Sequence, residues 1–572
     1  MSQQETINSL PEHLRPFVKT QSYDDYTPRD QAVWRFVLKH LTRQLRDTAH
    51  PVYLEGLART GICLDHIPSI EEMNQCLSQL GWRAVVVDGF IPPAIFMELQ
   101  ALKVLVIALE MRSVDHVFYT PAPDIVHESA GHAPFIVDID YAEFLQSFGE
   151  IGMKAIATRA DMEQYEAVRK LSIAKECPSS TDDDIARAEA ELRNIANSDV
   201  TPSEAALLTR LHWWTVEYGL VGKVGDYRIF GAGLLSSLGE SAHCLDEEAV
   251  KKVPLTVDAV LQPYDITREQ PQLFVTQSCK HLSQVLEEFA ESMCFRKGGA
   301  QSLQTAIEAG SICTASYDSG MQVSGVFTEV LTDAVGNAIY LRTEGPTQLA
   351  YKEVEIVGHG VSYHKEGFGS PIGHIKDFSH CLSHYTVDEL KALDVSVDQR
   401  VRLEYLSGIT VEGVLLNILR QEHRNLVLNF ADCTVVDLKG RILFDPAWGP
   451  YDLAIGSSIS SVYGGVADKG KLQLYKPTPS TDTIRISHDE QLMDGYRLAN
   501  RLRLKEDSTD KEEINSALQA ALKRYPQEWL LRAEILEVAS PALKKQLISE
   551  LQALGQANEE LEGLTTLALD SK

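Results

Sequence analysis

The sequence predicts a multidomain protein in which a mainly α-helical domain is followed by a β-rich domain and a helical C-terminal tail. At 572 residues the chain is too long for a single hydrophobic core. Apolar residues keep helical spacing up to about residue 300, and short β-branched runs between turn residues follow from about 315. The last segment is again rich in Leu, Glu, Lys and Ala. We therefore expect domains at 1–300, 315–476 and 483–572.

Within the first domain, helices are expected over 31–47 and 69–80, where apolar residues recur with helical spacing and charged residues occupy the opposite face. The segment 81–93 (GWRAVVVDGFIPP) is a short strand or a loop, because its β-branched run is closed by two prolines. The polar, charged region 154–198 is expected to form a solvated helical hairpin. The segment 178–184 (PSSTDDD) breaks this region. A second helix is expected over 185–197, because the acidic residues before it favour a helix start.

In the second domain, strands are expected over 401–406, 411–418, 426–430 and 438–444, forming a sheet or a small barrel. In FDPAWGPYD, Trp448 and Tyr451 are expected to pack in the core or a turn rather than to bind a ligand. The segment KPTPSTD (476–482) has the composition of a linker, and the charged EDSTDKEE (506–513) interrupts the helical tail. Partner binding, oligomerisation and packing on the first domain all stay open as roles for the β-rich region.

Composition excludes several classes of partner. The net charge of −28, with no strong basic run, argues against nucleic acid and against an anionic membrane. The first residues, MSQQETINSLPEHLRPF, do not have the pattern of a signal peptide, and the apolar run VLVIAL (104–109) is too short to span a membrane. The nine cysteines include no C-x-x-C pair, so we expect reduced thiols in a cytoplasmic protein.

The stretch HESAGH places His127 and His132 five residues apart, one more than in the H-E-x-x-H helix of zinc proteases. On a regular α-helix this spacing turns the second ring away by roughly 140°. Gly131 and Pro134 predict that the helix ends near Gly131. Such an end would let His132 swing back toward His127, so that the two rings could share a metal ion.

A third ligand would have to come from elsewhere, and Glu217 in LHWWTVEYGL is the candidate. A single carboxylate among apolar residues is costly unless it is paired or binds a metal. The alternative is that Glu217 points outward or pairs with Arg210. Two neutral imidazoles and one carboxylate, with coordination positions left open, suit ferrous iron that activates oxygen better than structural zinc.

Two motifs resemble the signatures of a known family. PDIVHESAGHAPF resembles the P-D-x-x-H-E-x-x-G-H-x-P signature of the pterin-dependent aromatic amino acid hydroxylases. WWTVEYGL, followed by YRIFGAGLLSSLGES (227–241), resembles the second signature of that family. The resemblance runs from about residue 25 to 295 and is nearest to the bacterial phenylalanine 4-monooxygenases. It implies that residues 1–300 form a hydroxylase-like catalytic domain.

The resemblance also implies roles for individual residues. His127, His132 and Glu217 match the catalytic iron ligands, and Arg112 matches the arginine that grips the substrate carboxylate with its planar fork. The substrate pocket is completed by Thr120, Pro123, Trp213, Gly233 and Ser236, and the pterin contacts are Phe96 and Glu128. Ser236 is also expected to steady His127. The implied cofactors are Fe(2+) and a tetrahydropterin (tetrahydrobiopterin or a related pterin).

Three features depart from the family pattern. Glu217 lies farther beyond His132 than in the family, and the region 154–198 accounts for the excess as an insertion. Ala122 stands where many members carry glutamate, and His212 stands where an aromatic residue is common. His212 could be a surface residue, a neighbour of the iron site or a rival ligand, and we favour the neighbour.

Three functional hypotheses follow. The first is a monooxygenase that converts L-phenylalanine to L-tyrosine with O₂, while tryptophan or tyrosine hydroxylation stays open because pocket differences are worth only a few kcal/mol. The second is a zinc hydrolase that uses HExxxH, with Glu128 as general base; the extra residue and the second signature count against it. The third is a binding or scaffold protein whose C-terminal half carries the function.

Overall fold

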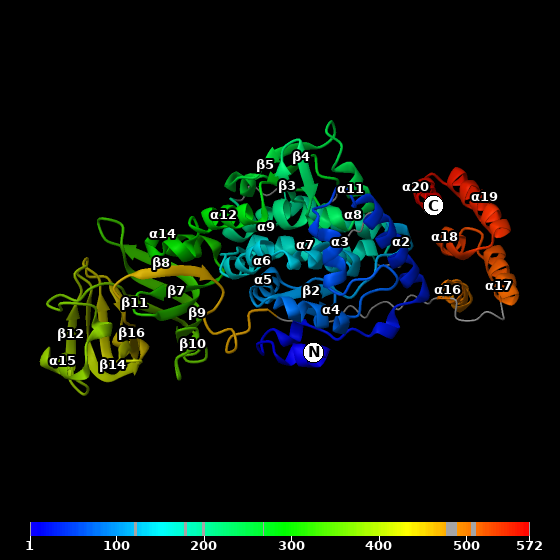
Figure 1. Ribbon diagram of the computed structural model, residues 1–572. Coiled ribbons are helices and arrows are strands. Elements are labelled where there is room, and N and C mark those ends of the chain that lie inside the picture. The colour runs from blue at the N-terminus through cyan, green and yellow to red at the C-terminus, as the bar shows by residue number, and fades with distance from the viewer. Residues whose placement is uncertain are drawn as a thin grey trace.

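A computed structural model gives the fold and describes residues 2–118, 123–176, 180–196, 201–266, 268–475, 489–504 and 511–570. Figure 1 shows a mainly helical body in the middle, a β-rich region at one end and a group of C-terminal helices at the other. The predicted order of helical, β-rich and helical segments is confirmed.

The helical body begins with helices whose ends are set by local sequence. At the start of α2 (Pro28–Gln44), the Thr27 and Asp30 side chains each accept a hydrogen bond from the other's backbone N–H. The helix predicted over 31–47 is therefore confirmed, with an earlier start. α4 (Ile70–Leu77) and the 3₁₀ turn Ser78–Leu80 confirm the helix predicted over 69–80. Other helices of the body are α1 (Gln3–Asn8), α3 (Val52–Arg59), α5 (Pro93–Ala101), α6 (Ile139–Gly152), α9 (Glu204–His212), α10 (Ala232–Leu235), α11 (Leu238–His243), α12 (Cys279–Ala290) and α13 (Cys294–Lys297).

Short strands complete the body. β1 (Arg83–Val87) pairs in parallel with β2 (Val104–Ala108), which confirms a strand within 81–93 and explains the apolar run at 104–109. Both strands are almost wholly buried, as is usual for parallel pairs. A second sheet has the order β4 (Asp226–Ile229), β3 (Leu220–Lys223), β6 (Gln272–Thr276) and β5 (Lys251–Pro254). β3 follows Glu217 closely and so anchors that end of its helix.

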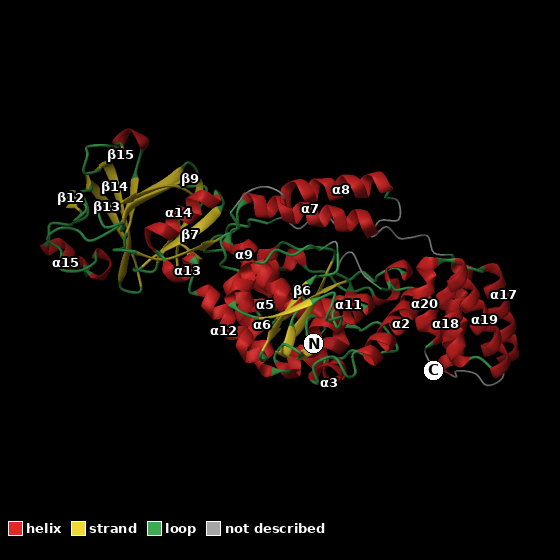
Figure 2. Ribbon diagram, turned by 90° about the horizontal axis from the view of Figure 1, so that it is seen from above, coloured by secondary structure: helices red, strands yellow, loops and turns green. Residues whose placement is uncertain are grey.

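The charged region 154–198 forms a pair of helices, α7 (Arg159–Glu176) and α8 (Asp182–Ala196), which lie side by side in Figure 2. Ion pairs join them, from Lys170 to Glu191 at 2.7 Å and from Lys175 to Glu189 at 3.0 Å. The predicted helical hairpin is confirmed, and its second helix begins three residues earlier than expected.

The described strands of the β-rich region fall into two sheets that follow α14 (Gly299–Ala309). The first contains β7 (Ile312–Tyr317), β8 (Met321–Thr332), β9 (Ala338–Tyr351), β10 (Val354–Glu355), β11 (Gly367–Pro371) and β17 (Ile459–Gly464). The second contains β12 (Arg400–Glu404), β13 (Thr410–Gln421), β14 (Arg424–Val436), β15 (Ile442–Phe444) and β16 (Tyr451–Ala454), and the short helix α15 (Val387–Ala392) precedes it.

The strands predicted over 401–406, 411–418 and 426–430 are confirmed as β12, β13 and β14. The strand predicted over 438–444 is only partly right, since β15 begins at Ile442. The preceding residues form a turn in which the Asp437 carboxylate accepts from the N–H groups of Lys439 and Arg441, and Gly440 has a φ of 82°. Tyr451 is buried in β16, while Trp448 is 60% exposed and packs its ring against Phe444, in line with the expected packing roles.

The C-terminal helices pack onto α2 of the body. They are α16 (Glu490–Leu504), α17 (Lys511–Arg524), α18 (Trp529–Val538), α19 (Pro541–Ala557) and α20 (Glu559–Leu569). The rings of Phe36 and Trp529 meet edge to face at 5.0 Å, and apolar residues of these helices belong to the same core as the body. The described residues of the tail predicted over 483–572 are therefore mainly helical. The predicted linker 476–482 and most of the break at 506–513 lie outside the described residues.

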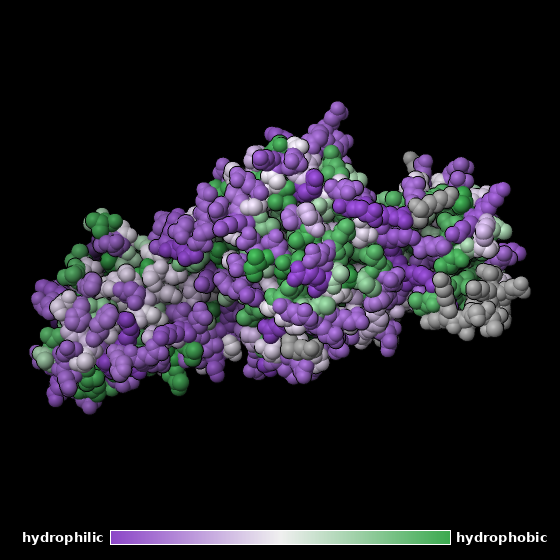
Figure 3. All heavy atoms as spheres, viewed as in Figure 1, coloured by the Kyte–Doolittle hydropathy of each residue, from purple (hydrophilic) through white to green (hydrophobic). Residues whose placement is uncertain are grey.

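Hydrophilic side chains cover most of the face in Figure 3, and hydrophobic ones form small separate groups. No helix among the described residues is long and apolar enough to cross a membrane. The cysteines in the described part of the chain are free thiols, and Cys177 lies outside it.

Candidate metal centre

His127 and His132 lie on a π-helix, Val126–His132, and not at the end of an α-helix. A π-helix hydrogen-bonds residues five apart, so its wider turn brings two such residues to the same side. The two Nε2 atoms are 3.2 Å apart. The chain then continues into a 3₁₀ helix, Ala133–Val137, which accepts Pro134 in its first turn. The helix end predicted near Gly131 is partly right, because the π-helix ends at His132, one residue later, but the chain goes on directly as a 3₁₀ helix. The predicted meeting of the two imidazoles is correct.

Gly131 has a packing role instead. A Cβ atom at this position would lie 2.9 Å from the carbonyl oxygen of Ala232 and 3.0 Å from its Cβ. Glycine therefore allows the π-helix to approach α10 closely, and this contact brings Ser236, just after α10, to the histidines.

Glu217 completes a triangle of donor atoms with the two histidines. It ends a second π-helix, Trp213–Glu217. Its Oε2 lies 3.2 Å from Nε2 of His127, and its Oε1 lies 3.4 Å from Nε2 of His132. Burial opposes its ionisation, but His132 and His127 outweigh burial and hold the pKa of this carboxyl well below its ordinary value. The alternative partner, Arg210, points instead toward the carbonyl of Val260.

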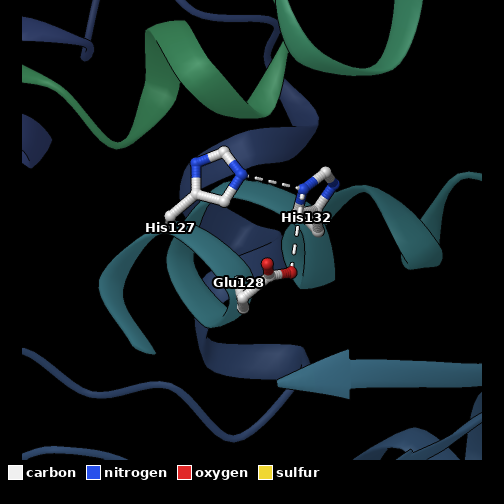
Figure 4. Close-up of side chains that lie close together, drawn as sticks. All are labelled: His127, Glu128 and His132. Carbon is white, nitrogen blue, oxygen red and sulfur yellow. Dashed lines mark hydrogen bonds and ion pairs between the residues drawn. The ribbon is translucent and has the colours of Figure 1, made fainter. Parts of the chain in front are cut away.

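Glu128 is a second carboxyl group beside the same histidines. Figure 4 shows it near His132, with the His127 ring facing His132 from the other side. The donor atoms of these three residues lie within 4.8 Å of one another, but the nearest Glu128 oxygen is 3.9 Å from Nε2 of His132. Burial raises the pKa of Glu128 to about 8, so it is neutral at pH 7. Glu217, ionised and closer to both rings, is therefore the better third ligand.

Ser236 sets the orientation of the His127 ring. Its hydroxyl donates to the carbonyl of Ala232 at 2.8 Å and lies 2.9 Å from Nδ1 of His127. Because the hydroxyl proton is used, the oxygen accepts from Nδ1–H, and Nε2 keeps its lone pair for a metal ion. The contact predicted between Ser236 and His127 is present.

Arg112 is buried and held by a carboxylate that sequence reasoning did not single out. Its Nε and Nη2 donate to the two oxygens of Asp124 at 2.7 and 2.8 Å, and its Nη1 donates to the carbonyl of Ser236 at 2.8 Å. Asp124 also accepts the backbone N–H of His127 at 3.0 Å. Burial opposes ionisation of Asp124, but Arg112 holds its pKa below the ordinary value. The signal for Asp124 was its place in the motif PDIVH, three residues before His127.

His212 lies beside the centre and not at the surface. Its Nδ1 is 3.7 Å from Oε1 of Glu217, and its ring meets the edges of Phe148 and Phe96 at 5.1 and 6.1 Å. Burial lowers its pKa to about 4, so the ring is neutral. This position agrees with the prediction that His212 is a neighbour of the metal site. Because Phe96 contacts His212, Phe96 also lies near this site.

The remaining predicted pocket residues have varied surroundings. Trp213 stacks on Tyr218 at 4.6 Å and on Tyr264 at 4.3 Å. Gly233 is buried against Tyr218, where a Cβ would lie 2.9 Å from the ring. Pro123 is exposed next to Asp124 in the chain. Thr120 and Ala122 lie outside the described residues.

The donor set fits a divalent iron ion. Two imidazole Nε2 atoms and one carboxylate approach one another to 3.2–3.4 Å, which suits ligands of a single ion. All three come from one side, so other coordination positions stay open, as in iron sites that activate oxygen.

Comparison with known proteins gives the family of the N-terminal part of the chain. Residues 17–173 and 177–297 match the family model of the biopterin-dependent aromatic amino acid hydroxylases. The phenylalanine-4-hydroxylases of Chromobacterium violaceum and Pseudomonas aeruginosa are each 28% identical to this chain over 46% of its length, and over 75% and 84% of their own. The N-terminal half of this chain thus belongs to the biopterin-dependent aromatic amino acid hydroxylase family, whose members use iron and a pterin.

Among solved structures, the chain is similar to the C. violaceum phenylalanine hydroxylase that holds iron(III) and 7,8-dihydrobiopterin. The sequences are 26% identical, the match covers 51% of this chain and 91% of that chain, and the TM-score is 0.39.

Proposed function

We propose that this protein is a monooxygenase that converts L-phenylalanine to L-tyrosine with O₂, ferrous iron and a tetrahydropterin. The convergence of His127, His132 and Glu217 carries the proposal. Phenylalanine is favoured because relatives from several bacteria carry the name phenylalanine-4-hydroxylase. Tryptophan or tyrosine hydroxylation is the alternative within the same family, since small changes of pocket shape shift such preferences.

In this proposal His127, His132 and Glu217 hold the iron, and Ser236 keeps Nε2 of His127 free to bind it. Iron and tetrahydropterin, when bound, supply the activation of O₂. The buried Phe148 beside His212, with the partly buried Trp213 and Tyr264, limits the access of water to the centre.

Arg112 binds the substrate carboxylate, and Asp124 with the Ser236 carbonyl fixes the plane of its guanidinium group. A planar cation held in this way is preorganised for a two-point contact with a carboxylate. The rest of the amino-acid pocket is formed by Thr120, Pro123, Trp213, Gly233 and Ser236. Phe96 and Glu128 contact the pterin.

The reaction is assigned to residues 1–300, with 154–198 as an insertion. The regions 315–476 and 483–572 are accessory in this proposal. Family membership argues against the zinc hydrolase hypothesis.

The test uses the purified full chain with ferrous iron, a tetrahydropterin, O₂ and L-phenylalanine, and follows tyrosine by chromatography. We expect pterin-dependent tyrosine formation. Glu217→Ala should abolish both activity and iron retention, whereas Glu143→Ala, on the exposed side of α6, should change neither. Pterin oxidation that responds only to tryptophan or tyrosine would move the substrate assignment within the family. Full activity of Glu217→Ala would overturn the iron site.

A further inference from the structure

A second cluster of metal-type ligands lies in the β-rich region, outside the part of the chain that matches the hydroxylase family. It consists of His359, His364 and Asp452, whose donor atoms lie within 4.8 Å of one another. The three residues are only 6%, 7% and 5% exposed. Buried histidine and aspartate side chains in such close contact need a partner that compensates for lost hydration.

The backbone holds the two histidines firmly. Both lie in the segment that connects β10 with β11. The carbonyl of His359 accepts from the N–H of Leu349, and the carbonyl of His364 accepts from the N–H of Thr347, each at 3.0 Å. Leu349 and Thr347 belong to β9, so the first sheet anchors both ligands.

Asp452 comes from the other sheet. It lies on β16, directly across from Asn429 on β14. The side-chain amide of Asn429 donates to Oδ1 of Asp452 at 2.5 Å, which leaves Oδ2 facing the two imidazoles. The Tyr363 ring packs against both imidazoles, with centroid distances of 5.5 and 4.7 Å, and covers the cluster.

The two distances to Asp452 fit a shared ion better than direct hydrogen bonds, whereas the two imidazoles are within hydrogen-bond distance of each other. Nδ1 of His359 and Nε2 of His364 are 3.2 Å apart, and each lies 3.8 Å from Oδ2 of Asp452. A separation of 3.8 Å is too long for a hydrogen bond. In a triangle with sides of 3.2, 3.8 and 3.8 Å, the nearest point equidistant from the corners lies in their plane, about 2.1 Å from each. An ion displaced from this plane toward a fourth ligand lies about 2.2 Å from each, which is within the tolerance of zinc–nitrogen and zinc–oxygen bonds.

We propose that His359, His364 and Asp452 bind one divalent transition-metal ion, for which Zn²⁺ serves as the test ion, and that this ion links the two sheets of the β-rich region. Two imidazoles and one carboxylate provide three ligands of a tetrahedral site and leave the fourth to water. The site is separate from the iron centre and does not depend on the hydroxylase reaction. Because its ligands come from both sheets, the bound ion stabilises their packing.

The experiment uses the full chain with His127→Ala and His132→Ala together, so that the iron centre cannot bind metal. The protein is loaded with Zn²⁺ and desalted, and its zinc content is measured by mass spectrometry. We expect roughly one equivalent of zinc, and less than about a tenth of an equivalent when Asp452→Asn or His364→Gln is added. Asp432→Asn, an exposed aspartate on β14, is the matched control and should keep the zinc.

A second measurement leaves the three ligands intact, so a folding defect cannot imitate its result. Co²⁺ is titrated into the same doubly substituted protein, and visible absorption bands of tetrahedral cobalt should saturate at one equivalent. Zinc should also raise the thermal unfolding midpoint of this protein but not of its Asp452→Asn derivative. Absence of bound zinc and of cobalt absorption in the intact cluster would overturn the proposal. Equal zinc content with and without Asp452→Asn would also overturn it.

Discussion

The hydroxyl of Ser236 links two backbones and one imidazole, and its geometry decides which nitrogen of His127 faces the metal. It donates to Ala232 and accepts from Nδ1 of His127, so the tautomer is fixed before any ion arrives. Asp124 acts in a similar way, because one carboxylate orients Arg112 and the backbone of His127 together. At this scale, Ser236 and Asp124, which are not proposed metal ligands, hold the proposed ligand His127 and the proposed substrate-binding Arg112.

Replacing Ser236 with alanine should therefore weaken iron binding and turnover. Loss of such an outer hydrogen bond typically costs about 10- to 100-fold in metal affinity or activity. Iron affinity and the initial rate of hydroxylation would be measured together. Ser129→Ala is the control, since Ser129 is buried on the same π-helix but bonds only to the carbonyl of Ile125. Equal effects of the two substitutions would show that the loss is only structural.

The pKa of Glu128 predicts a pH dependence of stability in the metal-free protein. Folding raises this pKa from 4.5 to about 8 through burial. The stabilising contribution is thus complete below pH 4.5, and it is lost as the pH rises toward about 8, by about 1.4 kcal/mol per pH unit at most. Glu128→Gln lacks this loss, so its stability relative to the unchanged protein should rise with pH.

Urea unfolding of the metal-free proteins at pH 5, 6.5 and 8 measures this difference. Glu143→Gln, at an exposed position of α6, serves as the control and should follow the unchanged protein at each pH. Parallel stability profiles for Glu128→Gln and the unchanged protein would contradict the prediction.

At the scale of secondary structure, both ligand-bearing segments are π-helices, Val126–His132 and Trp213–Glu217. A π-turn is less favourable than an α-turn, and it is found mostly at functional sites. Here tertiary packing holds it, because α10 approaches so closely that only glycine fits at position 131. The packing of these elements is what converts the five-residue spacing into a shared site.

Gly131→Ala should push the π-helix away from α10 and separate the ligands. The new Cβ would lie 2.9 Å from a backbone oxygen, and overpacking of this kind costs about 1–3 kcal/mol. We expect a lower unfolding midpoint and loss of iron. Gly239→Ala on α11 is the matched control, because its Cβ would meet atoms only at 3.5 Å or farther. Normal iron content in Gly131→Ala would refute the packing argument.

At the scale of the whole molecule, the C-terminal helices dock on α2 through a buried charge cluster. Nη2 of Arg35 contacts Oε2 of Glu534 at 2.6 Å, and Arg503 approaches the same oxygen at 3.3 Å. The Arg35 and Glu534 side chains are only 8% and 7% exposed. Removing one partner of such a pair leaves an uncompensated buried charge, which is more costly than losing a surface pair.

Glu534→Ala should therefore loosen the C-terminal helices, with a cost of about 3–5 kcal/mol. Faster hydrogen exchange of the α18 amides would reveal the loosening, and a lower free energy of unfolding would measure the cost. The double substitution Arg35→Met with Glu534→Leu should recover part of the loss, because it removes the two most buried charges but leaves that of Arg503, which is 20% exposed. Glu55→Ala, which breaks an exposed pair with Arg59 at 3.3 Å, should cost no more than about 0.5 kcal/mol. Unchanged exchange in Glu534→Ala would show that apolar contacts alone hold the tail.

Local patterns in the sequence were sufficient for much of this protein. Helical spacing located α2 and α4, β-branched runs located β12, β13 and β14, and the two motifs predicted that His127, His132 and Glu217 would meet. The helices and strands depend on residues close to one another in the sequence, and the three site residues belong to the motifs themselves. For this reason a single sequence contains them.

Only the tertiary structure decided the rest. Sequence reasoning expected a helix end at Gly131, but close packing against Ala232 produces a π-helix there. The pairing of Arg112 with Asp124, the docking of the tail on α2 and the approach of Asp452 to His359 and His364 join separate segments. The spacing of apolar residues in the sequence predicts which face of a helix or strand is buried. Contacts between separate segments depend on how helices and strands pack in space.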